Sequence, residues 1–330
     1  MNSKASETGI LAGSGSRPTQ TKLFVVAAAW SNLSVKPLIV LPFDRGFECK
    51  KYTRRPARNP VRFAQISALI LLAIEPSSYH NRAWYLNGQR RLNLDLGDNL
   101  VEGIFLERVN RFLARVEVDG QEVGVHVANS GRMKELFVPG WRVLVRPVSG
   151  EHRKTKFDLV LVDMGAALAS ADSRAPNALV AEGVVNGHLK QFAEYPEVRR
   201  EVTFGDSRLD LMLEGPTGRC YIEAKSVTLV ENGVGLFPDA PTVRGAKHLR
   251  TLETVLEAGH RAAVIFVIQR PDATAFATSD PSDPALAEAL RSAVSAGVEA
   301  YAYNCQVTER SIQLDQSLPI RPYAEAMANA

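Results

Sequence analysis

Three charged side chains stand close together in the segment Ser207–Ser226, which reads SRLDLMLEGPTGRCYIEAKS. The alternation of polar and apolar residues predicts two β-strands joined by a tight loop at residues 215–218. With that loop, the strand register places Asp210 directly opposite Glu223. Because side chains alternate along a strand, Asp210, Glu223 and Lys225 are expected to share one face of the hairpin.

Two carboxylates that face each other repel, by about 1 kcal/mol at ~4 Å in water and about 4 kcal/mol at an effective dielectric constant of about 20. A divalent cation between them would reverse that sign, and Mg²⁺ prefers such hard oxygen ligands. Lys225 would place an ammonium group where it orients a water or stabilises charge on a phosphate. The alternative is an ordinary solvated face of an amphipathic hairpin, against which the like charges of the pair argue. The opposite face is apolar and carries Leu209, Leu211, Leu213, Ile222 and Ala224.

Other chemical patterns are missing from the sequence. The six histidines are scattered without a metal-binding pair, and neither a Walker A sequence nor a GxGxxG loop occurs. The three cysteines, Cys49, Cys220 and Cys305, fit neither a disulfide framework nor a zinc pattern, which favours a reducing cytoplasm. No apolar run approaches the ~18 residues that a membrane-spanning helix needs. The number of copies in an assembly stays open, and a homo-oligomer is compatible with the sequence.

Residues 95–168 have the texture of a small all-β domain. Short alternating strands follow one another, and two of them are joined at Asp119–Gly120, a dipeptide typical of tight hairpin turns. One short helix is expected at Met133–Phe137. About five short strands within some 70 residues predict an OB-like β-barrel, a fold that binds nucleic acids.

Residues 169–330 combine helices and strands in the order α-β-β-β-α-β-α-β, which predicts an α/β domain with a mixed sheet. The first helix is expected over residues 177–192 and the last strand at 298–307. The helix after the hairpin can be capped by Thr242 and ended by Gly259. The strand that follows it is apolar throughout, which indicates burial on both faces.

Residues 1–94 differ from the rest in charge and pattern. They contain 14 Lys and Arg against 4 Asp and Glu, whereas the remaining residues contain 25 against 32. The excess positive charge of the chain therefore belongs to this extension and gives no argument for nucleic-acid binding by the body. One interpretation is a basic arm that binds nucleic acid or serves as an address. The interpretation we favour is a poorly structured segment, or one that arises from a start codon assigned too early.

Several longer segments resemble one known family. HVANSGRMKELFVPG, YIEAKSVTLVENGVGLFPDAPTVRGAKHL and LERVNRFLARVEVDG are closely similar to the sugar fermentation stimulation proteins. The resemblance covers about residues 96–322 and does not extend into residues 1–94. The hairpin motif itself, Asp, a turn and then Glu-x-Lys, resembles the metal site of the PD-(D/E)xK nuclease superfamily, although Leu209 stands where that motif has proline.

The resemblance implies an OB-like domain followed by a restriction-endonuclease-like (PD-(D/E)xK) domain in a DNA-binding protein. Carried over by position, Asp210 and Glu223 would bind Mg²⁺ or Mn²⁺ and Lys225 would complete the catalytic triad. Glu201 on the preceding strand is a possible further acid, and Ala224 would lend a backbone carbonyl to the metal. The leading hypothesis is a DNA-binding protein with a metal-dependent phosphodiesterase site. The alternatives are a DNA-binding regulator of sugar metabolism without cleavage, and a nuclease that acts on RNA or on a structured nucleic acid.

Basic and amide side chains mark candidate nucleic-acid contacts. In the barrel they would follow a phosphate backbone beside the ring of Phe112, and the low aromatic content of 7% favours phosphate contacts over base readout and hence weak sequence preference. In the helix after the hairpin they would hold a phosphate. The alternatives are a barrel used mainly for domain packing and a solvated helix face. The candidates are Arg108, Arg111, Asn129, Ser130, Arg132 and Lys134 in the barrel, and Arg244, Lys247 and His248 in the helix.

Overall fold

The computed structural model describes residues 23–27, 38–42, 85–86, 89–90 and 93–328. The chain divides into two compact units, Met1–Ser77 and Ser78–Ala330. In the first unit, β1 (Leu23–Ala27) pairs antiparallel with β2 (Leu38–Pro42). The prediction of a poorly structured extension over residues 1–94 otherwise falls mostly outside the described residues.

The predicted β-barrel is present, and its strands run from Val101 to Ser170. Its sheet has the order β11-β10-β8-β7-β6-β9, and an additional pairing of β10 with β9 closes it. All neighbours are antiparallel except β10 and β8. Phe105 and Leu159 are among the fully buried side chains that fill it. Its strands are β6 (Val101–Asn110), β7 (Leu113–Val118), β8 (Gln121–His126), β9 (Arg142–Pro147), β10 (Phe157–Asp163) and β11 (Leu168–Ser170).

Two turns of the barrel test the sequence-based expectations. The hairpin between β7 and β8 turns at Asp119 and Gly120, whose φ angles of 52° and 72° are those of a type I′ turn. The helix predicted at Met133–Phe137 is wrong, because only a turn forms there. Met133 has a φ of 46°, and the amides of Leu136 and Phe137 both donate to its carbonyl, so no helical ladder continues.

The second domain is built on a seven-stranded mixed sheet of order β12-β13-β14-β17-β19-β20-β5. The pairs β14–β17 and β17–β19 are parallel, and the other neighbours are antiparallel. This arrangement agrees with the predicted mixed α/β fold. The strands are β12 (Glu197–Phe204), β13 (Ser207–Gly215), β14 (Gly218–Val227), β17 (Arg261–Ile268), β19 (Glu299–Val307), β20 (Ser311–Leu318) and β5 (Leu94–Asp95).

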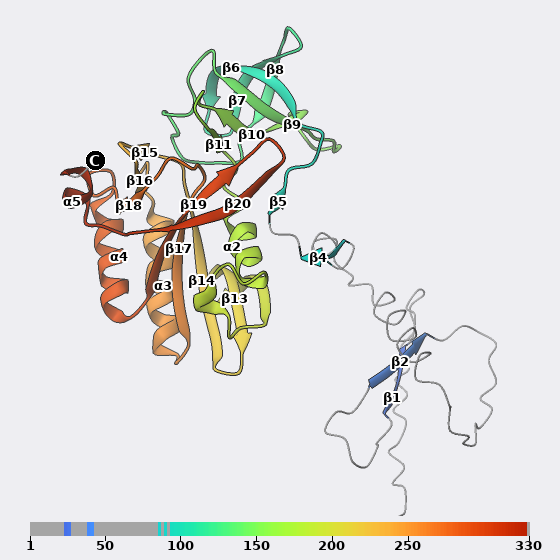
Figure 1. Ribbon diagram of the computed structural model, residues 1–330, viewed down its shortest axis with the longest axis vertical. Helices are drawn as coiled ribbons and strands as arrows, with labels where there is room; N and C mark the ends of the chain where they lie inside the picture. The colour runs from blue at the N-terminus through green and yellow to red at the C-terminus, as the bar shows by residue number, and fades with distance from the viewer. Residues whose placement is uncertain (1–22, 28–37, 43–84, 87–88, 91–92, 329–330) are drawn as a thin grey trace, which may run out of the picture. The chain divides into compact units, whose positions relative to one another are not determined.

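Helices cover both faces of this sheet (Figure 1). On one face lie α2 (Ala175–Val185) and the 3₁₀-helix η2 (Lys190–Phe192), whose apolar residues share a core with β13, β14 and β17. On the other face α3 (Val243–Glu257) and α4 (Pro284–Ala296) bury a second core. The remaining described elements are small. Strand β3 (Tyr85–Leu86) pairs with β4 (Gln89–Arg90), and β15 (Val230–Glu231), β16 (Val234–Phe237) and β18 (Ala275–Thr278) form a three-stranded sheet. The last helix is α5 (Tyr323–Ala328).

The start of α3 is held by two side chains. Thr242 is the predicted N-cap, and its hydroxyl accepts from the amide of Gly245 at 3.0 Å. Asp283 caps α4 with one carboxylate oxygen, which accepts from Leu286, and with the other it accepts from the amide of Thr242 at 2.8 Å. A single aspartate therefore joins the N-termini of α3 and α4.

The sequence-based element order lacks β15, β16, β18 and α5, and it differs from the structure in three further places. The helix expected over residues 177–192 ends at Val185 and resumes only as η2. Strand β20 follows the strand expected to be the last. Strand β5 pairs with β20, and the amide of Leu96 donates to the carbonyl of Arg310, so the chain enters the large sheet before it forms the barrel. Among the described residues, no helix has the length and apolar character to cross a membrane.

Candidate metal and nucleic-acid site

The hairpin of β13 and β14 has the predicted register up to one point. Pairing runs from Gly215 opposite Gly218 to Leu211 opposite Ile222 and then stops, although both strands continue. The carboxylate of Asp210 accepts from the amide of Ala224 at 2.8 Å, in place of a backbone carbonyl. The strands therefore part at Asp210.

The apolar face of the hairpin is also interrupted there. Leu211 and Leu213 pack into the core beneath α2, as expected, but Leu209 packs into the core beneath α3 and α4. The prediction that these three leucines share one face is wrong for Leu209. Regular alternation requires an unbroken ladder, and the ladder is broken at the residue between Leu209 and Leu211.

Asp210 is reached from the α2 side of the sheet. The side-chain amide of Asn177, in the first turn of α2, donates to its second oxygen at 3.1 Å, and Asn177 in turn accepts from Arg200 Nε at 2.7 Å. Burial raises the pKa of Asp210 above its ordinary value, and the charge of nearby Glu223 adds to that rise. Neither Asn177 nor Arg200 was predicted from the sequence, because neither belongs to the hairpin.

Glu223 is 3% exposed and is reached from the α3 side. Its Oε1 accepts from Lys225 Nζ at 2.7 Å and from His248 Nδ1. Its Oε2 is buried and has no hydrogen-bond partner among the described residues. Burial raises the pKa of this carboxyl, but the charge of Lys225 and the contact with His248 outweigh burial and bring the pKa below its ordinary value.

These residues fit a divalent cation held by oxygen atoms. A buried carboxylate oxygen without a donor is costly unless a cation or water satisfies it, and Glu223 Oε2 is such an atom. Asp210 is close enough for its pKa to respond to the charge of Glu223. Mg²⁺ needs only one or two protein carboxylates and completes its shell with water and phosphate oxygens. Within the described residues, no cluster of three or more His, Cys, Asp or Glu side chains could hold a metal ion.

Glu201, the fourth acid expected from the resemblance, lies elsewhere. Its φ is 56°, and its exposed carboxylate forms an ion pair with Arg208. The left-handed backbone directs the side chain to the surface, so the structure does not bring it to Asp210 and Glu223.

The three candidates on α3 have different environments. Arg244 is exposed, and its Nε donates to His248 Nε2 at 3.3 Å. His248 is 6% exposed and points at Glu223, so it belongs to the acid cluster and not to an outer phosphate-binding surface. Lys247 Nζ forms an ion pair with the carboxylate of Asp206 at 2.9 Å, so its charge is already paired within the protein.

Two candidates in the barrel are engaged in contacts within the protein. The guanidinium of Arg108 lies 5.0 Å from the centroid of the Phe137 ring. Asn129 is 8% exposed, and its side-chain oxygen accepts from the amide of Gly131. Arg108 donates to five backbone carbonyls, those of Gly131 and Arg132 (both 2.6 Å), Arg111 (2.7 Å), Asn129 (3.0 Å) and Asn110 (3.2 Å).

The remaining barrel candidates are exposed and lie on one surface. Arg108 donates to the backbone carbonyls of both Arg111 and Arg132. The two segments that carry these cations therefore lie side by side. Phe112 is 49% exposed and stacks on His126 with ring centroids 6.4 Å apart. The exposed candidates are Arg111, Ser130, Arg132 and Lys134.

This barrel surface adjoins the strand that carries the acids. The amide of Met133 donates to Asp239 at 3.0 Å, and Asp239 lies just before α3. A cavity of about 20 Å³ is lined by Asn129 and Gly131 from the barrel and by Ser226 from β14. Ser226 directly follows Lys225, so the barrel loop reaches the end of the strand that carries Glu223 and Lys225.

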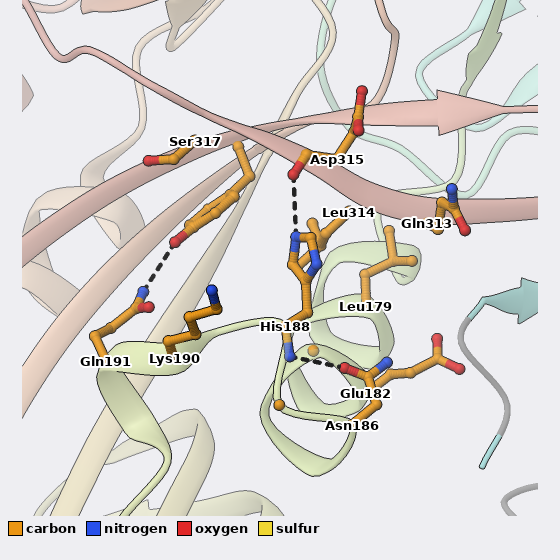
Figure 2. A pocket seen from close by; sticks show the side chains of 13 residues that line it. Leu179, Glu182, Asn186, His188, Lys190, Gln191, Gln313, Leu314, Asp315 and Ser317 are labelled. Carbon is orange, nitrogen blue, oxygen red and sulfur yellow. Dashed lines mark hydrogen bonds between the residues drawn. The ribbon is translucent and has the colours of Figure 1, made fainter.

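A cavity of about 700 Å³ lies elsewhere. It is formed by α2, η2, β19 and β20, and none of the triad lines it. Figure 2 shows His188, whose Nε2 lies 3.0 Å from the carbonyl of Asp315, and Gln191, which donates to the hydroxyl of Tyr303 at 3.0 Å. The volume of a cavity therefore does not show where the acids and Lys225 lie.

Comparisons with known proteins agree with the two domains. The family described as SfsA N-terminal OB domain matches residues 106–170, and the family described as sugar fermentation stimulation protein RE domain matches residues 174–311. A sugar fermentation stimulation protein homolog of Alkaliphilus metalliredigens is 48% identical over 222 residues, 67% of this chain and 96% of the relative. The homolog of Desulforamulus reducens is 44% identical over 222 residues, 67% of this chain and 92% of the relative.

A solved structure is also similar. It is that of Pyrococcus furiosus SfsA in complex with Ca²⁺, with 28% sequence identity and a TM-score of 0.65. The match covers 70% of this chain and 99% of that chain. The similarity therefore spans both the barrel and the mixed-sheet domain.

Proposed function

The chain belongs to the sugar fermentation stimulation protein family, and from this premise we propose that it is a DNA-binding protein with a divalent-metal-dependent phosphodiesterase site. One observation carries the proposal. The buried Oε2 of Glu223 lacks a donor among the described residues, while its Oε1 accepts from Lys225 and the charge of Glu223 contributes to the raised pKa of Asp210. A buried carboxylate oxygen without a donor costs free energy, and an ordinary solvated protein surface would have no reason to contain one.

In this proposal Asp210 and Glu223 hold Mg²⁺ or Mn²⁺, with the backbone carbonyl of Ala224 as a further oxygen ligand. The bound cation would supply Lewis-acid stabilisation of the charge on a phosphate. Lys225, whose side chain is 11% exposed, is positioned by Glu223 Oε1 and would orient the attacking water. Asn177 keeps the carboxylate of Asp210 in place from the α2 side. The Ca²⁺ held by the Pyrococcus furiosus protein supports a cation of this hard, oxygen-preferring class.

The nucleic acid would lie across the exposed cations of the barrel and of α3. Arg111, Arg132 and Lys134 would contact phosphates, Phe112 would offer one ring for stacking, and Arg244 would hold a phosphate beside the acids. Contacts of this kind carry little sequence information, so we propose DNA binding without strong sequence preference. Glu201 and Lys247 are paired with other residues, and we give them no role.

A second function is a DNA-binding regulator of sugar-utilisation genes that does not cleave. It is favoured by the small number of ligands, since the described residues contain no cluster of three or more metal-binding side chains. The third alternative, cleavage of RNA or of a structured nucleic acid, involves the same residues. In each case residues 95–168 would provide the OB-like barrel and residues 169–330 the nuclease-like domain. A cytoplasmic location is supported by the free, buried thiols of Cys220 and Cys305.

A cleavage assay tests the proposal. Plasmid DNA, single-stranded DNA and RNA are incubated with the protein and Mg²⁺ or Mn²⁺, and the Lys225→Ala variant is compared with wild type. The matched control is Lys190→Ala, which removes an exposed lysine of the remote cavity in Figure 2. We expect cleavage that requires the metal, is lost in Lys225→Ala and persists in Lys190→Ala. DNA retained in a gel shift without cleavage under either metal would select the regulator instead.

A further inference from the structure

A chain of three side chains runs from the surface of α3 to the acid cluster. Arg244 Nε donates to His248 Nε2 at 3.3 Å, and His248 Nδ1 contacts Glu223 Oε1. Lys225 donates to the same oxygen of Glu223. Both donors therefore approach one oxygen and leave Oε2 as the atom without a partner among the described residues. The rotamer of Glu223 is determined by these two donors.

The contact with Arg244 determines which nitrogen of His248 carries the hydrogen. An arginine Nε–H is a donor only, so His248 Nε2 must accept. A neutral imidazole with an accepting Nε2 carries its hydrogen on Nδ1, and Nδ1 then donates to Glu223 Oε1. Arg244 thus keeps His248 in the tautomer that binds Glu223. Such partners of metal-binding groups orient the ligands and strengthen metal binding.

Arg244 also has donors that are available to a ligand. It is exposed in the first turn of α3, and its two terminal nitrogens have no hydrogen bond within residues 93–328. A guanidinium with its Nε engaged and both Nη groups available is suited to bind a phosphate through two parallel hydrogen bonds.

We propose that Arg244 and His248 are positioning residues that couple phosphate binding to divalent-cation binding, an inference that rests on the proposed function. A phosphate on the Nη groups immobilises the guanidinium and keeps its Nε–H on His248. His248 in turn keeps its Nδ1–H on Glu223 Oε1, and Oε2 stays directed at the cation. Because coupling between two ligands is reciprocal, the cation must tighten phosphate binding by the same factor. Nucleic acid would thereby complete the metal site to which it binds.

Calorimetric titration with Ca²⁺, alone and in the presence of a short single-stranded DNA, measures the coupling without dependence on cleavage. For wild type we expect Ca²⁺ affinity to rise at least about fivefold when DNA is bound. His248→Asn keeps a donor near the position of Nδ1 and removes the acceptor for Arg244. It should retain Ca²⁺ affinity within about threefold without DNA, whereas His248→Phe, which removes both, should lose about tenfold or more.

The coupling factor decides the proposal. It should fall at least about threefold in Arg244→Ala and in His248→Asn, and stay at the wild-type value in Arg250→Ala, which removes another exposed cation of α3. If Arg244→Ala and His248→Asn both keep the wild-type factor, the coupling does not pass through these residues and the inference is wrong. If wild type takes up no Ca²⁺, or if Glu223→Gln binds Ca²⁺ as wild type does, the proposed metal site itself fails.

Discussion

Arg108→Ala should destabilise the protein, although a basic residue on an OB-like surface suggests a nucleic-acid contact. Arg108 donates to five carbonyls, three of them at 2.6–2.7 Å. Hydrogen bonds from charged donors contribute about 1.5–3 kcal/mol each. Arg108 is half-buried and some of the released carbonyls would reach water, so we expect a loss of about 3 kcal/mol. For a folded body of this size that corresponds to about 6–12 °C in the thermal midpoint.

Thermal and urea unfolding of the full chain measures this loss, and DNA affinity is measured in parallel. Arg108→Lys should recover less than half of it, because a lysine cannot reach five carbonyls with the geometry of a planar guanidinium. The matched control is Arg132→Ala, an exposed cation of the same loop. It should change stability by less than about 0.5 kcal/mol and weaken DNA binding. An Arg108→Ala protein as stable as wild type that nevertheless loses DNA affinity would refute the reasoning and make Arg108 a direct contact.

Three further predictions concern the site. Mg²⁺ or Mn²⁺ at about 100 times its Kd should raise the thermal midpoint by about 5–10 °C, and Glu223→Gln should abolish the rise in a thermal scan. Because the pKa of Asp210 is raised, the folded state keeps a proton that the unfolded chain releases, so stability should decline as pH rises from the ordinary aspartate range through the raised pKa. Asp210→Asn should flatten that part of a metal-free stability curve, and an unchanged curve would contradict the assigned shift. Gly131→Ala would place a Cβ 2.8 Å from an oxygen of Asp239, and denaturation should show a loss of about 1–2 kcal/mol. The matched control is Gly124→Ala, whose Cβ would meet no atom closer than 3.4 Å and should cost less than about 0.5 kcal/mol.

The hairpin was predictable because its features are local. The loop between Glu214 and Arg219 determines which residues face each other, and the structure confirms that register from Gly215 to Leu211. The limits of α3 were predictable for the same reason, since Thr242 and Gly259 act on their own helix. Local chemistry of this kind can be read from neighbouring residues in the chain.

The end of the pairing at Asp210 was not predictable, because it depends on a side chain that replaces a backbone acceptor for Ala224. Long-range contacts account for the other differences. His248 was expected to hold a phosphate where the helix faces the metal site, or else to lie on a solvated helix face, and only the packing of α3 on the sheet directs it to Glu223. Asn177 reaches Asp210 from a helix 33 residues earlier, and no spacing in the sequence indicates that contact.

The route of the chain through β5 has a practical consequence for dissecting the gene. The strand Leu94–Asp95 completes the edge of the large sheet before the barrel begins, and the same sheet resumes only after the barrel has been made. Topologically the barrel is an insertion near the beginning of the nuclease-like domain. No single cut can yield two intact halves, and a fragment that begins at Leu96 leaves Ser311 and Ile312 without their strand partner. Separating the two domains would require excision of the barrel and religation of its flanks.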